Sequence, residues 1–124
     1  MIFGIPCFTK RKNTMDKHVL RFLDTVVDSI SIIEEDLAGI GYHDYKTNRK
    51  KMIKVVDNFE TILEALQSIP NEIKDEHPDI DWQSLEGFRE KISDPHNGIN
   101  EQEVWRIAKM KLLKLKKMIN ESFF

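Results

Sequence analysis

The sequence predicts an all-α fold, an antiparallel bundle of four to five amphipathic helices, and three observations support this prediction. Apolar residues recur at three- and four-residue steps over most of the chain, which is the spacing of one buried helix face. No segment alternates between apolar and polar residues, and Asn97-Gly98 precedes a helix cap rather than a second apolar run. Short connections separate the periodic segments, and amphipathic helices joined in this way pack as antiparallel neighbours.

The first two predicted helices are long. One is expected from Asp16 to Leu37, with the glycines Gly39 and Gly41 ending it. Its apolar stripe consists of Val19, Leu23, Val26, Ile30, Ile33 and Leu37. Residues 42–47 are expected to form a connection, and Pro70 ends the second helix, because proline disfavours helical backbone in the residue before it. The second stripe consists of Met52, Val55, Val56, Phe59, Ile62, Leu66 and Ile69.

The remaining elements are shorter, and their ends are marked by caps. Residues 71–78 are expected to form a single helical turn closed by proline. Asp81 is a suitable N-cap for a helix that runs roughly from Trp82 to Ser93, and Pro95 breaks that helix. Asn100 with Glu103 resembles a capping box and opens a last helix. The inward positions of the last helix are predicted to be Trp105, Ala108, Leu112, Leu115 and Ile119.

Length and composition indicate a single helical domain. The chain has 124 residues, of which 1–14 are expected to form a loosely ordered extension and 15–124 the domain. A formal net charge of −2 excludes a globally basic nucleic-acid binder but not a local basic patch. No apolar run is long enough to span a bilayer, and the lone Cys7 suits a reducing compartment. We therefore expect a cytoplasmic protein that makes no use of a membrane.

Several kinds of site are excluded by residue spacing. The four histidines are scattered, no two share a helix face at four-residue spacing, and no zinc signature results. The five glycines are isolated, which excludes a P-loop and a dinucleotide-binding loop. We therefore expect neither a metal nor a cofactor.

Arg89 and His96 form the best candidate for a catalytic pair. An arginine carries a permanent charge for a phosphate, and a histidine exchanges protons near neutral pH. Together they suit RNA cleavage by attack of the 2′-hydroxyl, in which the histidine moves a proton and the arginine stabilises charge on phosphorus. The alternative is structural, because such residues at a helix–loop junction are commonly a salt-bridge partner and a solvent-facing loop residue.

Motifs in the second half resemble the HepT-like proteins of the HEPN superfamily. These motifs are Ile69-Pro70, the H-P-x-I-x-W element from His77 to Trp82, Gly87-Phe88-Arg89, Val104-Trp105, and Asn58, Glu60, Glu64 and Ala65 on the second helix. The resemblance extends roughly from Asp16 to Ile119. It implies a dimeric helical bundle that acts as a metal-independent RNA endonuclease and as the toxin of a type VII-like toxin–antitoxin module. The implied partner is an MNT-type nucleotidyltransferase, which adds AMP to a tyrosine of the toxin.

The family motif, R-x4–6-H-x-Y, is incomplete here. A gapped alignment matches Arg89 and His96 and puts Gly98 in place of the tyrosine. The ungapped alignment, which we prefer because both flanking motifs stay aligned, puts Asp94 in place of the histidine and His96 in place of the tyrosine. Since an exposed aspartate has a pKa of about 4, it is a poor acid at neutral pH.

Two hypotheses follow. The chain is either a ribonuclease, working or weakened, or a catalytically inactive module that binds a nucleotidyltransferase or RNA. Lys109, Lys116 and Lys117 are candidates for a basic groove, although a solvated helix face is the commoner role of such lysines.

Overall fold

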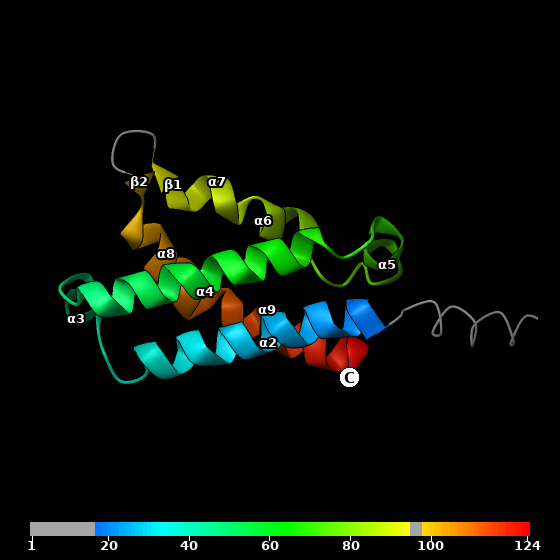
Figure 1. Cartoon of the computed structure of the whole chain (residues 1–124), viewed down its shortest axis with the longest axis horizontal. Helices are drawn as coiled ribbons and strands as arrows, with labels where there is room; N and C mark the ends of the chain where they lie inside the picture. The colour runs from blue at the N-terminus through cyan, green and yellow to red at the C-terminus, as the bar shows by residue number, and fades with distance from the viewer. Residues whose placement is uncertain (1–16, 95–97) are drawn as a thin grey trace, which may run out of the picture.

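A computed structural model describes residues 17–94 and 98–124 of the chain. Four helices form its body: α2 (Lys17–Leu37), α4 (Arg49–Gln67), α8 (Glu101–Met110) and α9 (Leu112–Phe123). Helix α2 packs along α4 and also contacts α8 and α9, and it runs antiparallel to all three (Figure 1). The predicted all-α antiparallel bundle is therefore confirmed.

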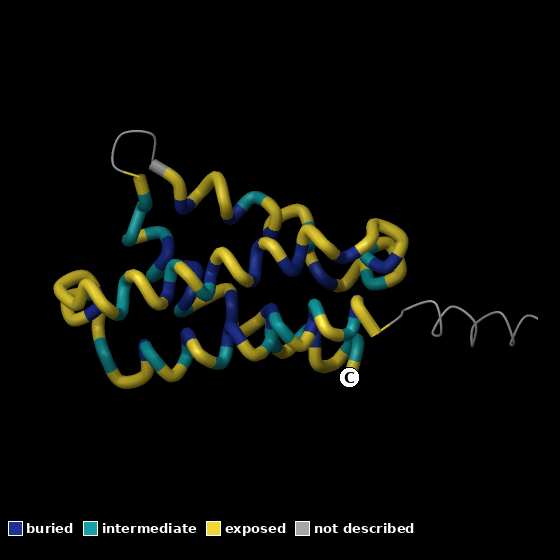
Figure 2. Tube along the Cα trace, viewed as in Figure 1, coloured by how far each residue is buried: buried dark blue, intermediate teal, exposed yellow. Residues whose placement is uncertain are grey.

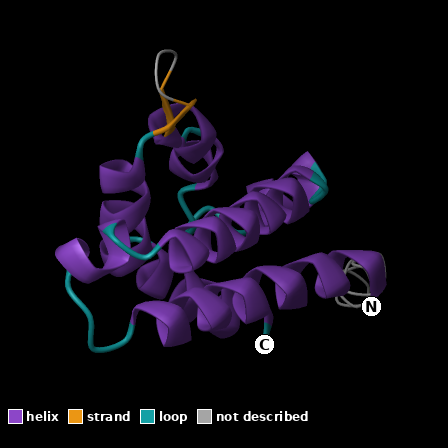
Figure 3. Cartoon of the chain, turned by 60° about the vertical axis from the view of Figure 1, so that its left-hand side comes forward, coloured by secondary structure: helices purple, strands orange, loops and turns teal. Residues whose placement is uncertain are grey.

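Shorter elements complete the bundle at its two ends. They are α3 (Tyr42–Lys46), α5 (Asn71–Glu76), α6 (Trp82–Glu86), α7 (Phe88–Ile92), β1 (Ser93–Asp94) and β2 (Gly98–Ile99). Helix α6 packs on α4, and α7 packs on α8. The two strands lie in the connection from α7 to α8 and project from the bundle on the side away from α2 (Figure 3).

The apolar stripes form the core, as their spacing predicts. All six stripe residues of α2 are at most 5% exposed. On α4 the stripe is buried at Val55, Phe59, Ile62 and Leu66. Figure 2 shows buried and exposed positions alternating along the long helices with the helical period. Burial of this apolar surface is the main stabilising contribution to the fold.

Several local predictions are confirmed at helix ends. Asp81 and Asn100 both act as N-caps, because their side chains accept hydrogen bonds from the backbone N–H groups of Ser84 and Glu103. Gly39 adopts a φ of +74°, a left-handed conformation that ends α2 at a position where other residues would be strained.

Two segments form secondary structure that was not predicted for them. The expected connection at residues 42–47 contains the short helix α3, whose N–H groups at Tyr45 and Thr47 donate to the carbonyls of Gly41 and His43. The segment at residues 93–99, for which no strand was expected, forms a β-hairpin with Ser93 opposite Ile99 and Asp94 opposite Gly98. Strands of two residues are too short for an alternating pattern to appear in the sequence.

Two expected helices are also divided. The helix predicted from Trp82 to Ser93 separates at Gly87 into α6 and α7, although the N–H of Lys91 still donates to the Gly87 carbonyl. The last helix separates at Lys111 into α8 and α9. Both parts of each helix bury an apolar face, so the apolar spacing continues across the break and does not reveal it in the sequence.

Some predictions fall outside the described residues. The expected extension at residues 1–14 and the side chain of His96 are among them. Within the described ranges, no helix is long and apolar enough to cross a membrane.

Candidate functional site

Arg89 lies on α7 with its side chain exposed. Within residues 17–94 and 98–124, its guanidinium group makes no hydrogen bond and no ion pair. Its backbone carbonyl accepts a 2.8 Å hydrogen bond from the Ser93 hydroxyl, which holds the end of α7. The alternative reading of Arg89 as a salt-bridge partner therefore finds no support in the described part of the chain, and the guanidinium group is free to bind an anion.

The other two candidate residues belong to the hairpin that follows α7. Asp94 is the last residue of β1, and its backbone pairs with that of Gly98. The structure therefore brings the Asp94 backbone close to the end of the helix that carries Arg89. His96 is one of the three residues between Asp94 and Gly98 that lie outside the described ranges, so its position relative to Arg89 stays a prediction.

A hydrogen bond that the sequence did not predict anchors the exit of the hairpin. The Tyr45 hydroxyl donates to the carboxylate of Glu101, which lies in the first turn of α8 directly after β2. The two residues are 56 positions apart in the chain. No local pattern can reveal a pair at this separation, since helix spacing relates only residues three or four apart.

The Tyr45 ring is fully buried and belongs to an aromatic cluster. Its centroid lies 5.3 Å from that of Trp105 and 6.3 Å from that of Tyr42. Burial raises the pKa of Tyr45 far above its usual value, and the hydrogen bond to Glu101 raises it further. The hydroxyl therefore remains a neutral donor to Glu101, and the start of α8 is held against α3.

Two of the three candidate lysines for a basic groove have partners on α2. Lys109 donates to the Leu37 carbonyl over 2.7 Å, and its ammonium lies 4.9 Å from the centre of the Trp105 ring. Lys116 pairs with Glu34 at 2.9 Å. Both lysines therefore join the C-terminal helices to α2. Lys117 alone of the three is exposed without a described partner, and a single lysine does not make a basic groove.

The H-P-x-I-x-W element has a structural role. The Trp82 indole N–H donates to the His77 carbonyl over 3.0 Å, and Ile80 between them is 2% exposed. The His77 ring stacks on Phe123 of α9 with 3.9 Å between centroids. This element therefore closes the turn before α6 and packs it on the end of the chain. His77 and Trp82 therefore act as packing residues.

A metal centre finds no support in the described ranges. There, no three histidine, cysteine, aspartate or glutamate side chains lie close enough together to hold an ion. The polar chemistry that the structure offers at this end of the bundle is that of an exposed guanidinium beside a short hairpin.

Comparisons with known proteins agree with the motifs. The family described as "Ribonuclease HepT-like" matches residues 26–122. A "Probable ribonuclease HepT" of Thermococcus cleftensis is 30% identical over 95 residues, which cover 77% of this chain and 86% of the relative. A "Putative RNase" of Caldanaerobacter subterraneus is 23% identical over 100 residues, which cover 81% and 89% of the two chains.

A further relative, a "Putative RNase" of Methanocaldococcus jannaschii, is 26% identical over 101 residues, which cover 82% of this chain and 87% of the relative. No solved structure matches this chain. The family match spans all the motifs from the second helix to Trp105, and it includes the helix that carries the free arginine. The chain belongs to the HepT-like ribonuclease family.

Proposed function

We propose that this protein is the toxin component of a toxin–antitoxin module and that it cleaves RNA without a metal ion, at a rate lowered by its altered motif. The observation that carries this proposal is the exposed guanidinium group of Arg89 on α7, which has no hydrogen-bond or ion-pair partner among the described residues, in a chain of the HepT-like ribonuclease family. A permanent cation without a protein partner is suited to bind a phosphodiester.

The proposed reaction needs a cation at the phosphate and a group that moves protons. The RNA 2′-oxygen attacks the adjacent phosphorus, and its proton passes to a base. The bond from phosphorus to the 5′-oxygen breaks, and that oxygen takes up a proton. The products are a 2′,3′-cyclic phosphate and a 5′-hydroxyl. Arg89 stabilises the charge that develops on phosphorus, and His96, with Asp94 as the alternative, transfers the protons.

The hairpin geometry supports the ungapped alignment of the motif. In the gapped alignment the family tyrosine corresponds to Gly98, whose φ is +87°. A Cβ at this position would meet nothing within 4 Å, but a tyrosine there would have to adopt a strained left-handed backbone. This conformation disfavours the gapped alignment, and in the ungapped alignment Asp94 occupies the position of the histidine.

This alignment explains why we propose a lowered rate. An aspartate with a pKa of about 4 holds almost no proton at neutral pH, so it donates poorly to the leaving oxygen. His96 would then act from a displaced position, and such a displacement can cost about 100-fold in rate. Neither alignment leaves a tyrosine in the motif, so we propose that an MNT-type partner does not add AMP at this place.

The direct test is RNA cleavage by the purified chain in excess EDTA. We expect slow cleavage of single-stranded RNA into products with cyclic phosphate ends, and no cleavage of the same sequence carrying 2′-O-methyl groups. His96→Ala is expected to abolish the residual activity, whereas Asp94→His is expected to increase it. Cleavage that stops in EDTA, or that continues on the methylated strand, would contradict the proposed chemistry.

We also propose a homodimer, which would bring two Arg89 residues to a shared region. A hollow of about 310 Å³ beside α4 is lined by Met52, Ile53, Val56 and Ile99, and Ile53 is 51% exposed. Arg49, Asp57 and Glu101 also line this hollow, and an apolar patch with charged residues around it suits a second copy of the chain. Sedimentation of the parent chain is expected to give a dimer, and Ile53→Glu is expected to give a monomer that remains folded.

The second candidate is an inactive module that binds a nucleotidyltransferase or RNA. The observation that favours it is the loss of the tyrosine in both alignments and of the histidine in the preferred one. A well-folded parent dimer that cleaves no RNA in EDTA, yet co-purifies with a co-expressed nucleotidyltransferase, would favour this candidate over the nuclease.

A further inference from the structure

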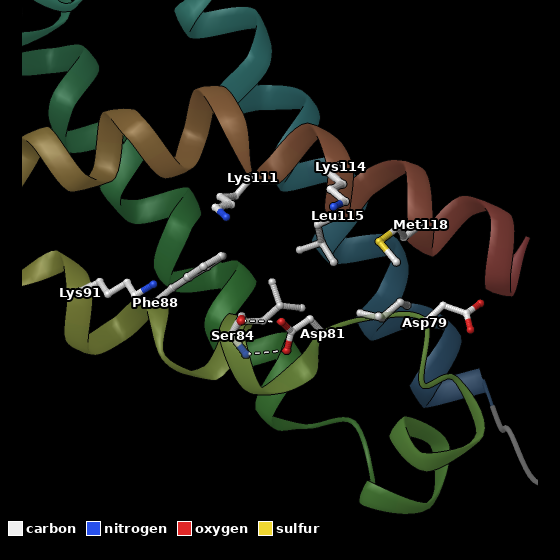
Figure 4. Close-up of a pocket in the computed structure, with 11 residues that line it drawn as sticks. Asp79, Asp81, Ser84, Phe88, Lys91, Lys111, Lys114, Leu115 and Met118 are labelled. Carbon is white, nitrogen blue, oxygen red and sulfur yellow. Dashed lines mark hydrogen bonds between the residues drawn. The ribbon is translucent and has the colours of Figure 1, made fainter.

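A pocket of about 180 Å³ lies between α6, α7 and the start of α9 (Figure 4). Its inner wall is apolar, because Leu85, Phe88 and Leu115 are 6%, 3% and 4% exposed and Met118 closes one side. The proposed cleavage reaction uses none of these residues. An apolar hollow with polar groups at its rim is the common form of a ligand site.

Three lysines stand at the rim of this pocket. Lys91 comes from α7, Lys111 from the break between α8 and α9, and Lys114 from α9. Across residues 17–94 and 98–124, none of the three makes a hydrogen bond or a close ion pair. They differ in this from Lys109 and Lys116, which are held by α2. The pocket-facing lysines are therefore available to a ligand.

The two aspartates at the pocket offset part of this charge, and three lysines against two carboxylates leave an excess of positive charge. Both carboxylate oxygens of Asp81 accept hydrogen bonds from Ser84, which lower the pKa of Asp81 and keep it charged, and Lys111 also favours the charged form. Figure 4 shows the Asp79 carboxylate at the far end of the pocket from Lys91 and Lys111, turned away from them. The end of the pocket at Phe88 is therefore cationic, and an anionic group on a partly apolar ligand complements it.

We infer that this pocket binds one nucleotide of a single-stranded RNA. The phosphate would lie against Lys91, Lys111 and Lys114, and the base against Leu115 and Met118. Proteins that bind single-stranded RNA combine a cationic groove with aromatic side chains on which bases stack, and Phe88 is the aromatic residue of this pocket. The volume is below the ~300 Å³ at which pockets for whole drug-sized ligands begin, which suits a single unit of a strand.

The pocket is positioned to hold RNA beside the proposed nuclease site. Arg89 lies on α7 between Phe88 and Lys91, so it is within about 3 Å of both along the helix axis. Residues one and two positions apart do not share a helix face, so a strand with one nucleotide in the pocket would cross α7 to reach the guanidinium group. This inference rests on the proposed function, because it assigns the same RNA a second point of contact.

Binding can be measured apart from cleavage with a labelled 2′-O-methyl oligonucleotide of about ten nucleotides, a length within the range of single-strand sites. Fluorescence anisotropy across a salt series is expected to show that Lys111→Ala with Lys114→Ala weakens binding about tenfold. The salt dependence should fall by about 0.7 per lysine removed. Met118→Trp, which fills the pocket without changing charge, should also weaken binding. Lys117→Ala, an exposed lysine of α9 outside the pocket, is the matched control and should change little.

Each outcome separates the inference from the proposed function. Loss of affinity in the pocket variants but not in Lys117→Ala supports the inference, provided that circular dichroism shows all variants folded. Equal affinity of parent and pocket variants, in a chain that cleaves RNA, overturns the pocket and leaves the nuclease intact. A parent chain that neither binds nor cleaves RNA overturns both. A free nucleoside monophosphate that binds as tightly as the oligonucleotide overturns the strand site as well.

Discussion

The body of the bundle and the α7–hairpin junction use their side chains in opposite ways. Along α2, α4 and α9 the named apolar residues are nearly all buried, and the lysines that face α2 have described partners. On α7, by contrast, Arg89 and Lys91 are exposed and make no described hydrogen bond or ion pair. The comparison indicates that the residues that stabilise the fold differ from those assigned to the proposed reaction. A substitution in one set should therefore have little effect on the property that depends on the other set.

The largest expected effect is on the body of the bundle. Phe59 is fully buried on α4, and its ring meets Phe88 edge-on at 6.1 Å between centroids. Phe59→Ala removes this packing and leaves a cavity, so we expect the free energy of unfolding to fall by about 3–5 kcal/mol in urea titration. Gln67→Ala, at an exposed position of the same helix outside the proposed dimer surface, is the control and should cost far less. Similar losses in both variants would show that α4 is not buried as described.

The next largest effect on stability is expected at the hydrogen bond that joins Tyr45 of α3 to Glu101 at the start of α8. Tyr45→Phe keeps the buried ring but removes the hydrogen bond to the Glu101 carboxylate. Hydrogen bonds to charged groups contribute about 1.5–3 kcal/mol, and we expect a loss of this order in urea titration. Glu101→Gln, which retains an acceptor for the hydroxyl, should lose less. An unchanged Tyr45→Phe variant would mean that the hairpin exit is held by packing alone.

The same tyrosine makes a prediction about pH. Because burial and Glu101 raise the pKa of Tyr45 in the folded state, its neutral form is favoured by folding. Its contribution to stability should be complete below about pH 10, the usual pKa of tyrosine, and should decline as the pH rises above that value. The parent should therefore lose stability more steeply above pH 10 than Tyr45→Phe does. Parallel curves for the two proteins would be evidence against this burial.

A smaller effect is expected at the ion pair that joins α9 to α2. Lys116 and Glu34 are 31% and 33% exposed, and ion pairs exposed to solvent contribute about 0–1 kcal/mol. Lys116→Ala should lower stability by no more than this, and salt should reduce the difference. Lys117→Ala is the matched control with no described partner. If the two variants differ by several kcal/mol, the pair is better shielded than its exposure indicates.

The smallest stability effect is expected at Arg89. Its side chain has no described partner, so Arg89→Ala should change the free energy of unfolding by less than about 0.5 kcal/mol. Thermal and urea unfolding check this directly. A loss above about 1 kcal/mol would indicate a structural contact for Arg89 and would weaken its assignment to RNA.

The parts of the fold that sequence could predict are those that depend on local spacing. The stripe from Val19 to Leu37 and the N-caps Asp81 and Asn100 depend on neighbours within one or two helical turns, and all are confirmed. The hairpin at Asp94 and Gly98 could not be predicted, because a two-residue strand is too short to show an alternating pattern.

The candidate site divides in the same way. Arg89 could be put forward as a candidate from its position in the Gly87-Phe88-Arg89 motif, and the structure places its side chain at the surface. The Tyr45–Glu101 hydrogen bond and the partners of Lys109 could not be predicted, since they join residues distant in the chain. Lys111 and Lys114 are three residues apart, the spacing of one helix face, so their approach to one pocket could be predicted from the sequence.

The most direct test compares RNA cleavage in EDTA by Arg89→Ala and by the parent chain. The free energy of unfolding of both proteins is measured in parallel. Removing a group that stabilises charge in the transition state commonly costs about 100-fold or more in rate. We predict a loss of this size with unfolding unchanged. A variant that cleaves RNA as fast as the parent would contradict the assignment of Arg89 to the phosphate.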